Sequence, residues 1–444
     1  MALNAEVMQA VERLDYRVTV GDVAAQAGLD IKVAQQALLV LASDVQAHLQ
    51  VSESGEIAYE FPRHFRTVLR NKFWRLRLQE TWDQVWRVLF YLIRISFGIL
   101  LLVSIALIFI TIAILLIAAS SADREGGRRN RSFGGGGLIF LPRIWFGPNI
   151  FWFFDFDYGR RRYPRHTTTY TRTNPKAENQ MNFFEAIFSF LFGDGDPNAD
   201  REERRWRSIA SVIRNHSGAV VAEQISPYLD DLGKGWSRDY EDYMLPVLSR
   251  FNGQPAVSPQ GGLIYHFPEL QVSATDRGNR SVSAYLKESR WKFSEASSGQ
   301  IMLAIGLGSM NFIGALILGS LLGDRAIVAE LGGLVAFVNS IYWLLLAYGA
   351  AFLGTPLIRY FWIQWRNGHI EGRNGKRQQR AIALNQAGDE VREKITYAQQ
   401  FAAQTIVGKE DLAYTTETDL VEQEAAQSDK IDAEWRRRLR QSNL

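Results

Sequence analysis

The sequence predicts a mainly α-helical membrane protein with three transmembrane helices and two winged-helix-like modules, and it leaves open a fourth, short or re-entrant, membrane element. Two observations predict this class. Apolar residues are concentrated in a few long, uncharged runs. The phrase VSESGEIAYEFP, at residues 51–62, also returns as VSPQGGLIYHFP at residues 257–268. Because a helix–turn–helix pattern precedes each copy, we interpret the phrase as part of a duplicated module.

The composition excludes several kinds of site. The 444 residues carry a net charge of only +3, so overall charge indicates neither nucleic acid nor an acidic partner. The chain contains no cysteine, which excludes disulfides and thiolate-bound zinc or iron–sulfur clusters. The first residues lack the charged and apolar regions of a secretory signal, so we expect the first membrane span to direct insertion.

Residues 1–62 have the pattern of a winged-helix-like module. Thr19 is a good helix N-cap, Gly28 supplies a turn, and apolar residues recur at helical spacing over residues 33–41. The phrase at residues 51–62 then alternates around a Ser-Gly turn, as a two-stranded hairpin does. Since alternate side chains of a strand share one face, we expect three residues to point inward. They are Ile57, Tyr59 and Phe61.

A basic neck, residues 63–96, follows this acidic module. Residues 1–62 hold three Lys/Arg and nine Asp/Glu, whereas residues 63–94 hold eight and two. Apolar residues recur at helical spacing along the neck, so we expect it to lie at the lipid headgroups and bind anionic lipid. An ordinary membrane-flanking helix is the alternative. The apolar residues are Phe65, Leu69, Phe73, Leu76, Trp82, Val85, Trp86 and Leu89. Residues 97–119 form an uncharged run long enough to cross a bilayer.

Residues 120–182 form a linker rich in glycine, arginine and aromatic residues. Basic residues precede both the first span and the later hairpin of spans, which marks a cytoplasmic start for both. If the chain crossed the membrane only once between these two starts, they would lie on opposite sides of it. Segment 138–154 would satisfy it as a short crossing or re-entrant element, and an interfacial hairpin turning at residues 147–149 is the alternative.

Residues 193–200, GDGDPNAD, place oxygen-bearing side chains at alternate positions, as a calcium-binding loop does. The candidate metal ligands are Asp194, Asp196, Asn198 and Asp200. The pattern departs from a calcium loop because Ala199 replaces the expected glycine and Arg205 the expected glutamate. We favour the alternative, a turn in which Asp200 caps the next helix together with Glu203.

A second winged-helix-like module, with an amphipathic lead-in, occupies residues 183–300. We expect its helices at residues 201–214, 219–225 and 239–251, with an inserted loop between the last two. The second copy of the phrase follows, and its inward residues should be Leu263, Tyr265 and Phe267. Two such modules could pack together as a pseudo-symmetric pair.

Residues 301–353 contain two apolar runs, 301–322 and 331–353, which predict a transmembrane hairpin. Small residues recur at every fourth position and predict a close helix-packing seam, with Asn311 and Asn339 able to hydrogen-bond across it. The seam residues are Asn311, Ala315, Gly319 and Gly323 on one helix and Gly332, Ala336 and Ser340 on the other. A polar helical tail, residues 354–444, ends in EWRRRLRQ and suits partner binding.

Two resemblances bear on function. The stretch TVGDVAAQAGLD, residues 19–30, resembles the opening of lactose-repressor-type DNA-binding domains, which implies a membrane-tethered regulator. Over most of its length the chain resembles an uncharacterised group of cyanobacterial and plastid membrane proteins. This resemblance is carried by the early span, IWFGPNIFWFFDFDYGRRRY, FSFLFGDGDPN and the late hairpin. Plant members of that group are labelled iron–sulfur cluster biosynthesis proteins, a role that a cysteine-free chain does not support.

The charge pattern decides between the functional hypotheses. DNA affinity depends on neutralising phosphates, yet the first module is acidic, and Asp239, Glu241 and Asp242 begin the third helix of the second. We therefore expect a membrane-anchored scaffold or assembly factor that docks protein partners, with a membrane-tethered DNA regulator as the alternative. We expect no enzyme activity, cofactor or nucleic-acid partner. The expected location is the thylakoid or plasma membrane of a cyanobacterium, or a plastid membrane, with the modules on the cytoplasmic side.

Overall fold

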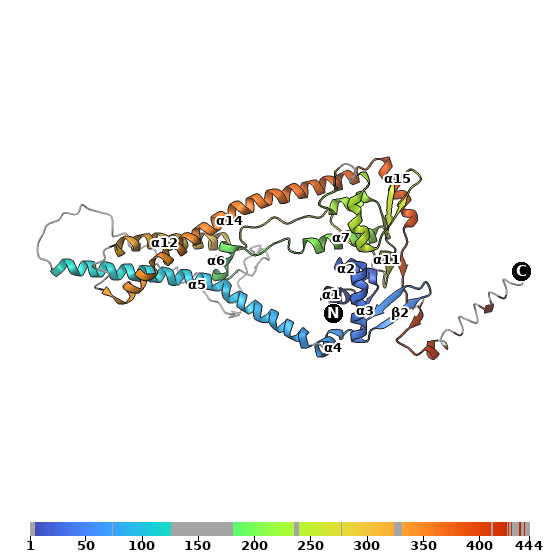
Figure 1. Ribbon diagram of the computed structural model, residues 1–444, viewed down its shortest axis with the longest axis horizontal. Helices are drawn as coiled ribbons and strands as arrows, with labels where there is room; N and C mark the ends of the chain where they lie inside the picture. Colours follow the sequence, from blue (N-terminus) through green and yellow to red (C-terminus); the bar gives the residue numbers. More distant parts are fainter. Residues whose placement is uncertain are drawn as a thin grey trace, which may run out of the picture. The chain divides into compact units, whose positions relative to one another are not determined.

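The computed structural model describes most of the chain, which is mainly helical as predicted and divides into two compact units (Figure 1). The module unit comprises residues 1–82, 196–290 and 366–444, and the membrane unit comprises residues 83–195 and 291–365. The described residues are 5–72, 74–125, 181–234, 239–276, 278–323, 331–409 and 412–423, with a few positions between 425 and 439.

The module unit begins with three helices and a small sheet. Thr19 caps the second helix, since its hydroxyl accepts from the backbone N–H of Asp22 while its own N–H donates to the Asp22 carboxylate, both at 3.1 Å. Gly28, at φ 69°, ends that helix in the left-handed region that glycine favours. The elements are α1 (Ala5–Arg13), β1 (Arg17–Val18), α2 (Val20–Ala27), α3 (Ile31–Val45), β2 (His48–Ser52) and β3 (Ile57–Glu60).

The second half of the module unit repeats this order with a shorter second helix. The N–H of Val221 donates to the side chain of Gln224 at 3.0 Å, where the first half has Thr19 and Asp22. The predicted helix at residues 219–225 is a strand followed by one helical turn. The elements are α7 (Arg201–Asn215), β4 (Ala219–Val220), α8 (Ala222–Ile225), η2 (Ser226–Tyr228), η3 (Asp242–Met244), α10 (Leu245–Phe251), β5 (Gln254–Val257) and β6 (Leu263–His266).

The two sheets correspond strand for strand. Both are antiparallel, with orders β1-β3-β2 and β4-β6-β5 over these strands. Val51 lies opposite Ile57 and Leu49 opposite Tyr59, while Val257 lies opposite Leu263 and Pro255 opposite Tyr265. Each copy of the repeated phrase thus begins in the outer of these three strands, β2 or β5, and continues through the middle strand, β3 or β6, at the same register.

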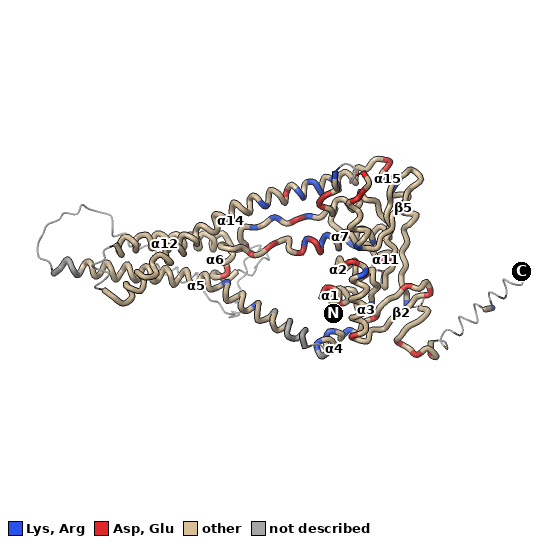
Figure 2. Tube along the Cα trace, viewed as in Figure 1, with Lys and Arg blue, Asp and Glu red and all other residues tan. Residues whose placement is uncertain are grey.

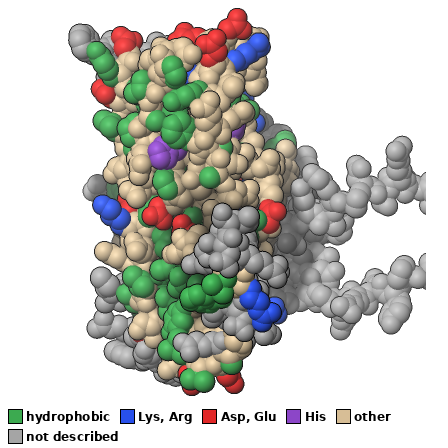
Figure 3. Space-filling model, turned by 90° about the vertical axis from the view of Figure 1, so that its right-hand side faces the viewer, with side chains coloured by type: hydrophobic (Ala, Val, Ile, Leu, Met, Phe, Trp, Pro, Cys, Tyr) green, Lys and Arg blue, Asp and Glu red, His purple; other side chains and the backbone are tan. Residues whose placement is uncertain are grey.

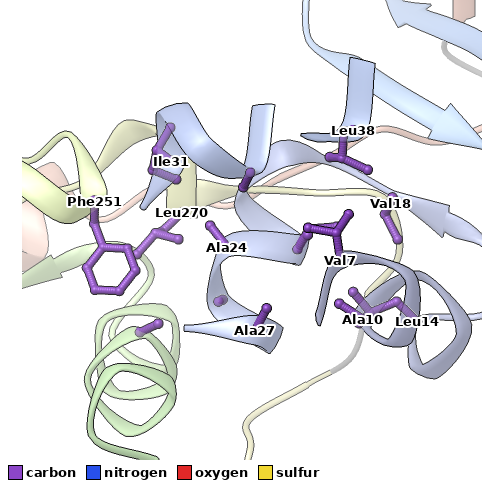
Figure 4. Packing of buried hydrophobic residues seen from close by; sticks show 14 of the residues in the cluster. Val7, Ala10, Leu14, Val18, Ala24, Ala27, Ile31, Leu38, Phe251 and Leu270 are labelled. Carbon is purple, nitrogen blue, oxygen red and sulfur yellow. The ribbon is translucent and has the colours of Figure 1, made fainter. Parts of the chain in front are cut away.

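The expected inward residues are largely confirmed. Tyr59, Phe61, Tyr265 and Phe267 are buried in one apolar cluster. Ile57 was wrongly predicted: it is 42% exposed because it starts β3 beside the turn, where no core residue covers it. Leu263 is partly buried at the matching place. The same cluster joins the two halves, and Figure 4 shows Phe251 and Leu270 beside Ala24 and Ile31.

The chain after the membrane hairpin adds strands that were not predicted for a polar helical tail. β8 pairs in parallel with β7 (Val272–Ser273), and β9 pairs with β2 as a fourth strand of the first sheet. These strands are only two and four residues long, which is too short for a clear two-residue period. The tail elements are the end of α14 (Gly333–Asn385), α15 (Asp389–Ala398), η4 (Gln399–Phe401), β8 (Thr405–Ile406) and β9 (Leu412–Thr415).

Among its described residues, the membrane unit contains three helices long and apolar enough to cross a bilayer, as predicted. They are part of α5 (Trp74–Glu125), α12 (Ser298–Leu322) and part of α14, and their apolar stretches are uncharged in Figure 2. α5 and α12 run in the same direction, since Leu101 clusters with Ala304 and Leu115 with Leu322. A short apolar helix, α6 (Phe183–Phe192), packs against Leu101.

The predicted seam is half right. On α12, Asn311 and Ala315 are buried. On α14, the small residues Ala336 and Ser340 are exposed instead. Aromatic residues of α14 fill the notches left by glycines of α12: a Cβ built on Gly308 would overlap Phe352, and one built on Gly319 would overlap Tyr342. Large-into-small packing therefore replaces the predicted contact of small residues on both helices.

The neck divides between two environments. Phe65 and Leu69, expected at the headgroups, are fully buried in the module unit, where α4 (Phe65–Lys72) packs on the core. Trp82 and Trp86 are exposed, as a lipid-facing helix requires. The predicted element at residues 138–154 and most of the EWRRRLRQ segment lie outside the described residues.

Candidate functional site: the paired modules and their anchors

Asp194, the first candidate metal ligand, anchors the membrane unit. Its carboxylate accepts from the hydroxyl of Ser189 at 2.6 Å and from the backbone N–H of Glu295 at 2.9 Å, and Arg94 lies 3.3 Å away. One carboxylate therefore joins the end of α6, the approach to α12 and α5.

The other three candidate ligands lie in the module unit and have separate partners. Asp196 accepts from the N–H of Asn198 at 2.8 Å, and Asp200 accepts from Arg204 at 3.0 Å instead of capping α7. Asn198 binds both backbone groups of Ser289, each at 2.8 Å. Among the described residues no group of three or more His, Cys, Asp or Glu side chains is placed to hold a metal, so metal binding here stays a prediction.

The segment before α12, which Asn198 binds at Ser289, is also bound by α14 at the neighbouring Glu288. Asn374 accepts from the N–H of Glu288 at 2.9 Å and donates to its carbonyl at 2.8 Å, as a neighbouring strand would. Arg373 binds both carboxylate oxygens of Glu288, and the fully buried Arg377 lies 2.8 Å from it. Burial alone would raise the pKa of Glu288, but these guanidinium groups lower it to about 2.

These arginines have structural roles that the sequence did not predict, because basic residues beside a membrane span are expected there from the charge bias of its cytoplasmic end alone. Arg380 likewise donates to the carbonyls of Ser226 and Leu229, at 3.1 and 2.7 Å. A hydropathy pattern identifies where a span ends, but it cannot tell a lipid-facing arginine from a paired one. The signal that was available is their spacing, since Arg373, Arg377 and Arg380 fall on one face of a helix.

The junction between the two halves centres on a buried carboxylate. Asp22 is 0% exposed and receives the N–H of Ala274 at 2.8 Å and the hydroxyl of Ser273 at 3.0 Å, besides its bond with Thr19. Arg214 of α7 lies 2.8 Å from it. Asp22, which completes the capping box of α2 in the first half, is thereby also the acceptor for the second half, which makes the pair one folded body.

A second polar cluster holds the tail on the second half. Lys394 of α15 lies 3.2 Å from Glu223 and 3.5 Å from Glu241, and the hydroxyl of Tyr265 donates to Glu241 at 2.8 Å. Burial raises the pKa of Glu241 and outweighs the opposing effect of Tyr265 and Lys394. Glu241, expected to begin the third helix of this module, instead precedes η3 and points into the protein.

The two third helices present different surfaces. In α10, Arg250 donates to the carbonyl of Gly28 and lies over the ring of Trp206 at 4.5 Å, so its charge is used within the protein. In α3 the outer face is exposed and carries a single charge. Its residues are Lys32, Val33, Gln35, Gln36 and Leu39.

The chain was also compared with known proteins. It is 36% identical over 451 residues to the uncharacterized chloroplastic protein At5g03900 of Arabidopsis thaliana, an alignment that covers 99% of this chain and 82% of the relative. The chain belongs to the At5g03900 family. No protein-family profile matches the chain. No solved structure matches it either.

The At5g03900 family agrees with the predicted resemblance to plastid proteins at the level of the whole chain. With three helices able to span a membrane, the chain is compatible with a plastid membrane protein. The relative's description names a chloroplast and no chemistry, so it supports neither the iron–sulfur label nor the likeness to lactose-repressor-type domains.

Proposed function

We propose that this protein is a membrane-anchored scaffold or assembly factor of a photosynthetic membrane, which docks protein partners through two winged-helix-like modules. Each half of the module unit has helices followed by a hairpin that shares a sheet with a short first strand, the arrangement expected of a winged helix. The observation that carries the proposal is the outer face of α3 over residues 32–39, which is exposed and bears only one charged side chain, Lys32.

The α3 face suits a protein partner. Val33 and Leu39 are 45% and 47% exposed and lie among glutamines, a mixture of apolar and neutral polar groups typical of docking surfaces. Asp22 and Arg214 hold the two halves together, so the face is presented on a preformed body. Little conformational entropy would then be lost on binding.

A membrane-tethered DNA regulator is the alternative, and the charges disfavour it. α3 offers Lys32 as its one basic side chain, in a segment with three Lys/Arg against nine Asp/Glu over residues 1–62. Arg250 of α10 is already bound to Gly28. With Lys32 on α3 and an already bound Arg250 on α10, these helices have too few basic side chains to neutralise several phosphates.

Lipid is the second proposed partner. Trp82 and Trp86 are 67% and 54% exposed on α5, ahead of the uncharged span, and Arg87 lies beside them in sequence. Indole rings and basic residues at this position suit the headgroup region and anionic lipid.

The test places a photo-crosslinking residue at position 36, an exposed position between Val33 and Leu39, of the full chain in native membranes. We expect adducts with a protein partner, which Val33→Asp with Leu39→Asp removes. Leu245→Asp, at a 61% exposed position of α10, is the matched control and should leave the adducts unchanged. The scaffold proposal fails if the full chain in detergent instead binds generic duplex DNA more tightly than about 1 μM at moderate salt.

A further inference from the structure

The fourth strand of the first sheet comes from the tail. β9 pairs with β2 so that Val51 lies opposite Tyr414 and Gln50 opposite Thr415. Just beyond, the N–H of Thr416 donates to the carbonyl of Leu49 at 3.0 Å, and the N–H of Leu49 donates to the hydroxyl of Thr416 at 2.8 Å. The backbone of Leu49 therefore points out of the three-stranded sheet and binds the tail.

The matching edge of the second sheet lacks one backbone donor. Leu49 lies opposite Tyr59, and the residue opposite Tyr265 is Pro255. Proline has no backbone N–H, so β5 cannot make the bond that Leu49 makes, and proline is characteristic of sheet edges that accept no further strand. β5 is the last strand of its sheet among the described residues, and Val257 is 61% exposed on it.

We propose that the outer edge of β2 is an acceptor site for one extended strand, that its occupant is residues 412–416 of this chain, and that Pro255 closes the equivalent edge of the second module to that strand. The duplication gives two candidate edges for one tail strand. A single backbone donor, present at Leu49 and missing at Pro255, selects between them. This proposal is independent of the scaffold function.

The contacts of β9 indicate a strand that can be exchanged. It has four residues, its register shifts between Val51 and Ser52, and Tyr414 is 39% exposed. Figure 3 shows hydrophobic side chains gathered on the face that carries the strands. A short edge strand with few buried contacts opens at low free-energy cost, and an added peptide can then pair with the freed edge.

The far side of β9 is protected. The side chain of Gln423 accepts from the N–H of Thr415 at 3.0 Å and donates to its carbonyl at 2.6 Å. It thereby occupies the outward backbone groups of Thr415 as a further strand would. The sheet is thus extended by one strand and then closed, which limits edge-to-edge association.

The experiment uses the full cysteine-free chain and a synthetic peptide, residues 410–418, with cysteine in place of Tyr414. A short bismaleimide should join this peptide to a Val51→Cys chain, since these positions are opposite each other, and not to a Val257→Cys chain. Pro255→Leu should restore capture at Val257→Cys. Leu49→Pro should lower capture at Val51→Cys by roughly fivefold, the ratio implied by one lost backbone hydrogen bond, whereas Leu49→Ala keeps the N–H and should not.

Equal capture at Val257→Cys with Pro255 in place would overturn the proposal, as would undiminished capture by the Leu49→Pro chain. If the Leu49→Pro chain fails to fold, the Pro255→Leu chain still tests the proposal, because this substitution adds a backbone N–H donor to the exposed edge of β5. If the strand-acceptor proposal is overturned, the cross-linked adducts of the α3 face are still expected, so this experiment and the test of the scaffold function are independent.

Discussion

Asp22 and Arg214 form an ion pair at 2.8 Å in which the carboxylate is 0% exposed, and the two residues belong to different halves of the module unit. Removing one partner of a buried pair leaves the other charge without compensation, which typically lowers stability by about 3–5 kcal/mol. We expect Asp22→Ala to lower the free energy of unfolding of the detergent-solubilised chain by this amount. Asp15→Asn, at an exposed position of the same module, is the control and should have little effect.

The aromatic residues of the repeated phrase give the second prediction. Tyr59→Ala and Tyr265→Ala should each destabilise the module unit by about 3–5 kcal/mol, because both rings are 3% exposed. Ile57→Ala should have a much smaller effect because its side chain is 42% exposed. Chemical denaturation followed by tryptophan fluorescence measures both. Equal losses for Ile57 and Tyr59 would contradict the assigned faces of β3.

The third prediction concerns pH. The pKa of Glu288 is lowered from 4.5 to about 2, so its carboxylate binds fewer protons in the folded state than in the unfolded state. Its contribution to stability is therefore complete above about pH 4.5 and is lost as pH falls from there toward 2. Glu288→Gln should be less stable than the parent at pH 7, and the difference should shrink over this window. A constant difference across the window would show that Arg373 and Arg377 do not act on its charge.

Sidedness gives the fourth prediction. Arg94 and Glu295 both bind Asp194, and Arg359 donates to the carbonyl of Phe190 at 2.9 Å, so these residues mark one end of the three membrane helices. The chain leaves toward all three segments of the module unit from that end. Ser54→Cys and Gln260→Cys, at matching exposed hairpin tips, should label from the same side of sealed vesicles. Labelling from opposite sides would contradict this prediction.

The fifth prediction concerns helix packing in the membrane unit. A Cβ on Gly349 would lie 2.9 Å from the side-chain oxygen of Asn311 and 3.1 Å from the Cα of Phe312. Since α12 backbone must move to accommodate it, Gly349→Ala should destabilise the helix pair by about 1–3 kcal/mol. Gly354→Ala, with nothing within 4 Å of its Cβ, is the matched control. Thermal unfolding in detergent should separate the two variants.

Local signals explain which features could be predicted from sequence. The three spans follow from long apolar runs, and the Thr19 cap and both hairpins follow from patterns a few residues long. The partners of Asp22 could not be predicted, because Arg214, Ser273 and Ala274 lie far along the chain and no local pattern connects them. Ile57 was misplaced because alternation identifies a face of a strand but not where the covering helices end.

The candidate site shows the same limit. The residues of GDGDPNAD have oxygen ligands at metal-binding spacing, yet Asn198 binds Ser289 and Asp194 binds Glu295, both supplied by a distant segment. A loop that binds backbone N–H and C=O groups of another segment needs the same oxygen-bearing side chains as a loop that binds a cation. The two kinds of loop can be distinguished only once the position of that other segment is known.

The pairing of β9 with β2 also constrains the order in which this protein can mature. Leu49 and Thr416 are separated by 367 residues, and the three membrane spans of the described chain are made between them. At about 5–20 residues per second, a ribosome needs roughly 20–70 s to reach the second of these residues after the first. During that interval the first sheet has a bare edge, and the nascent chain must keep it from foreign strands while its spans enter the bilayer.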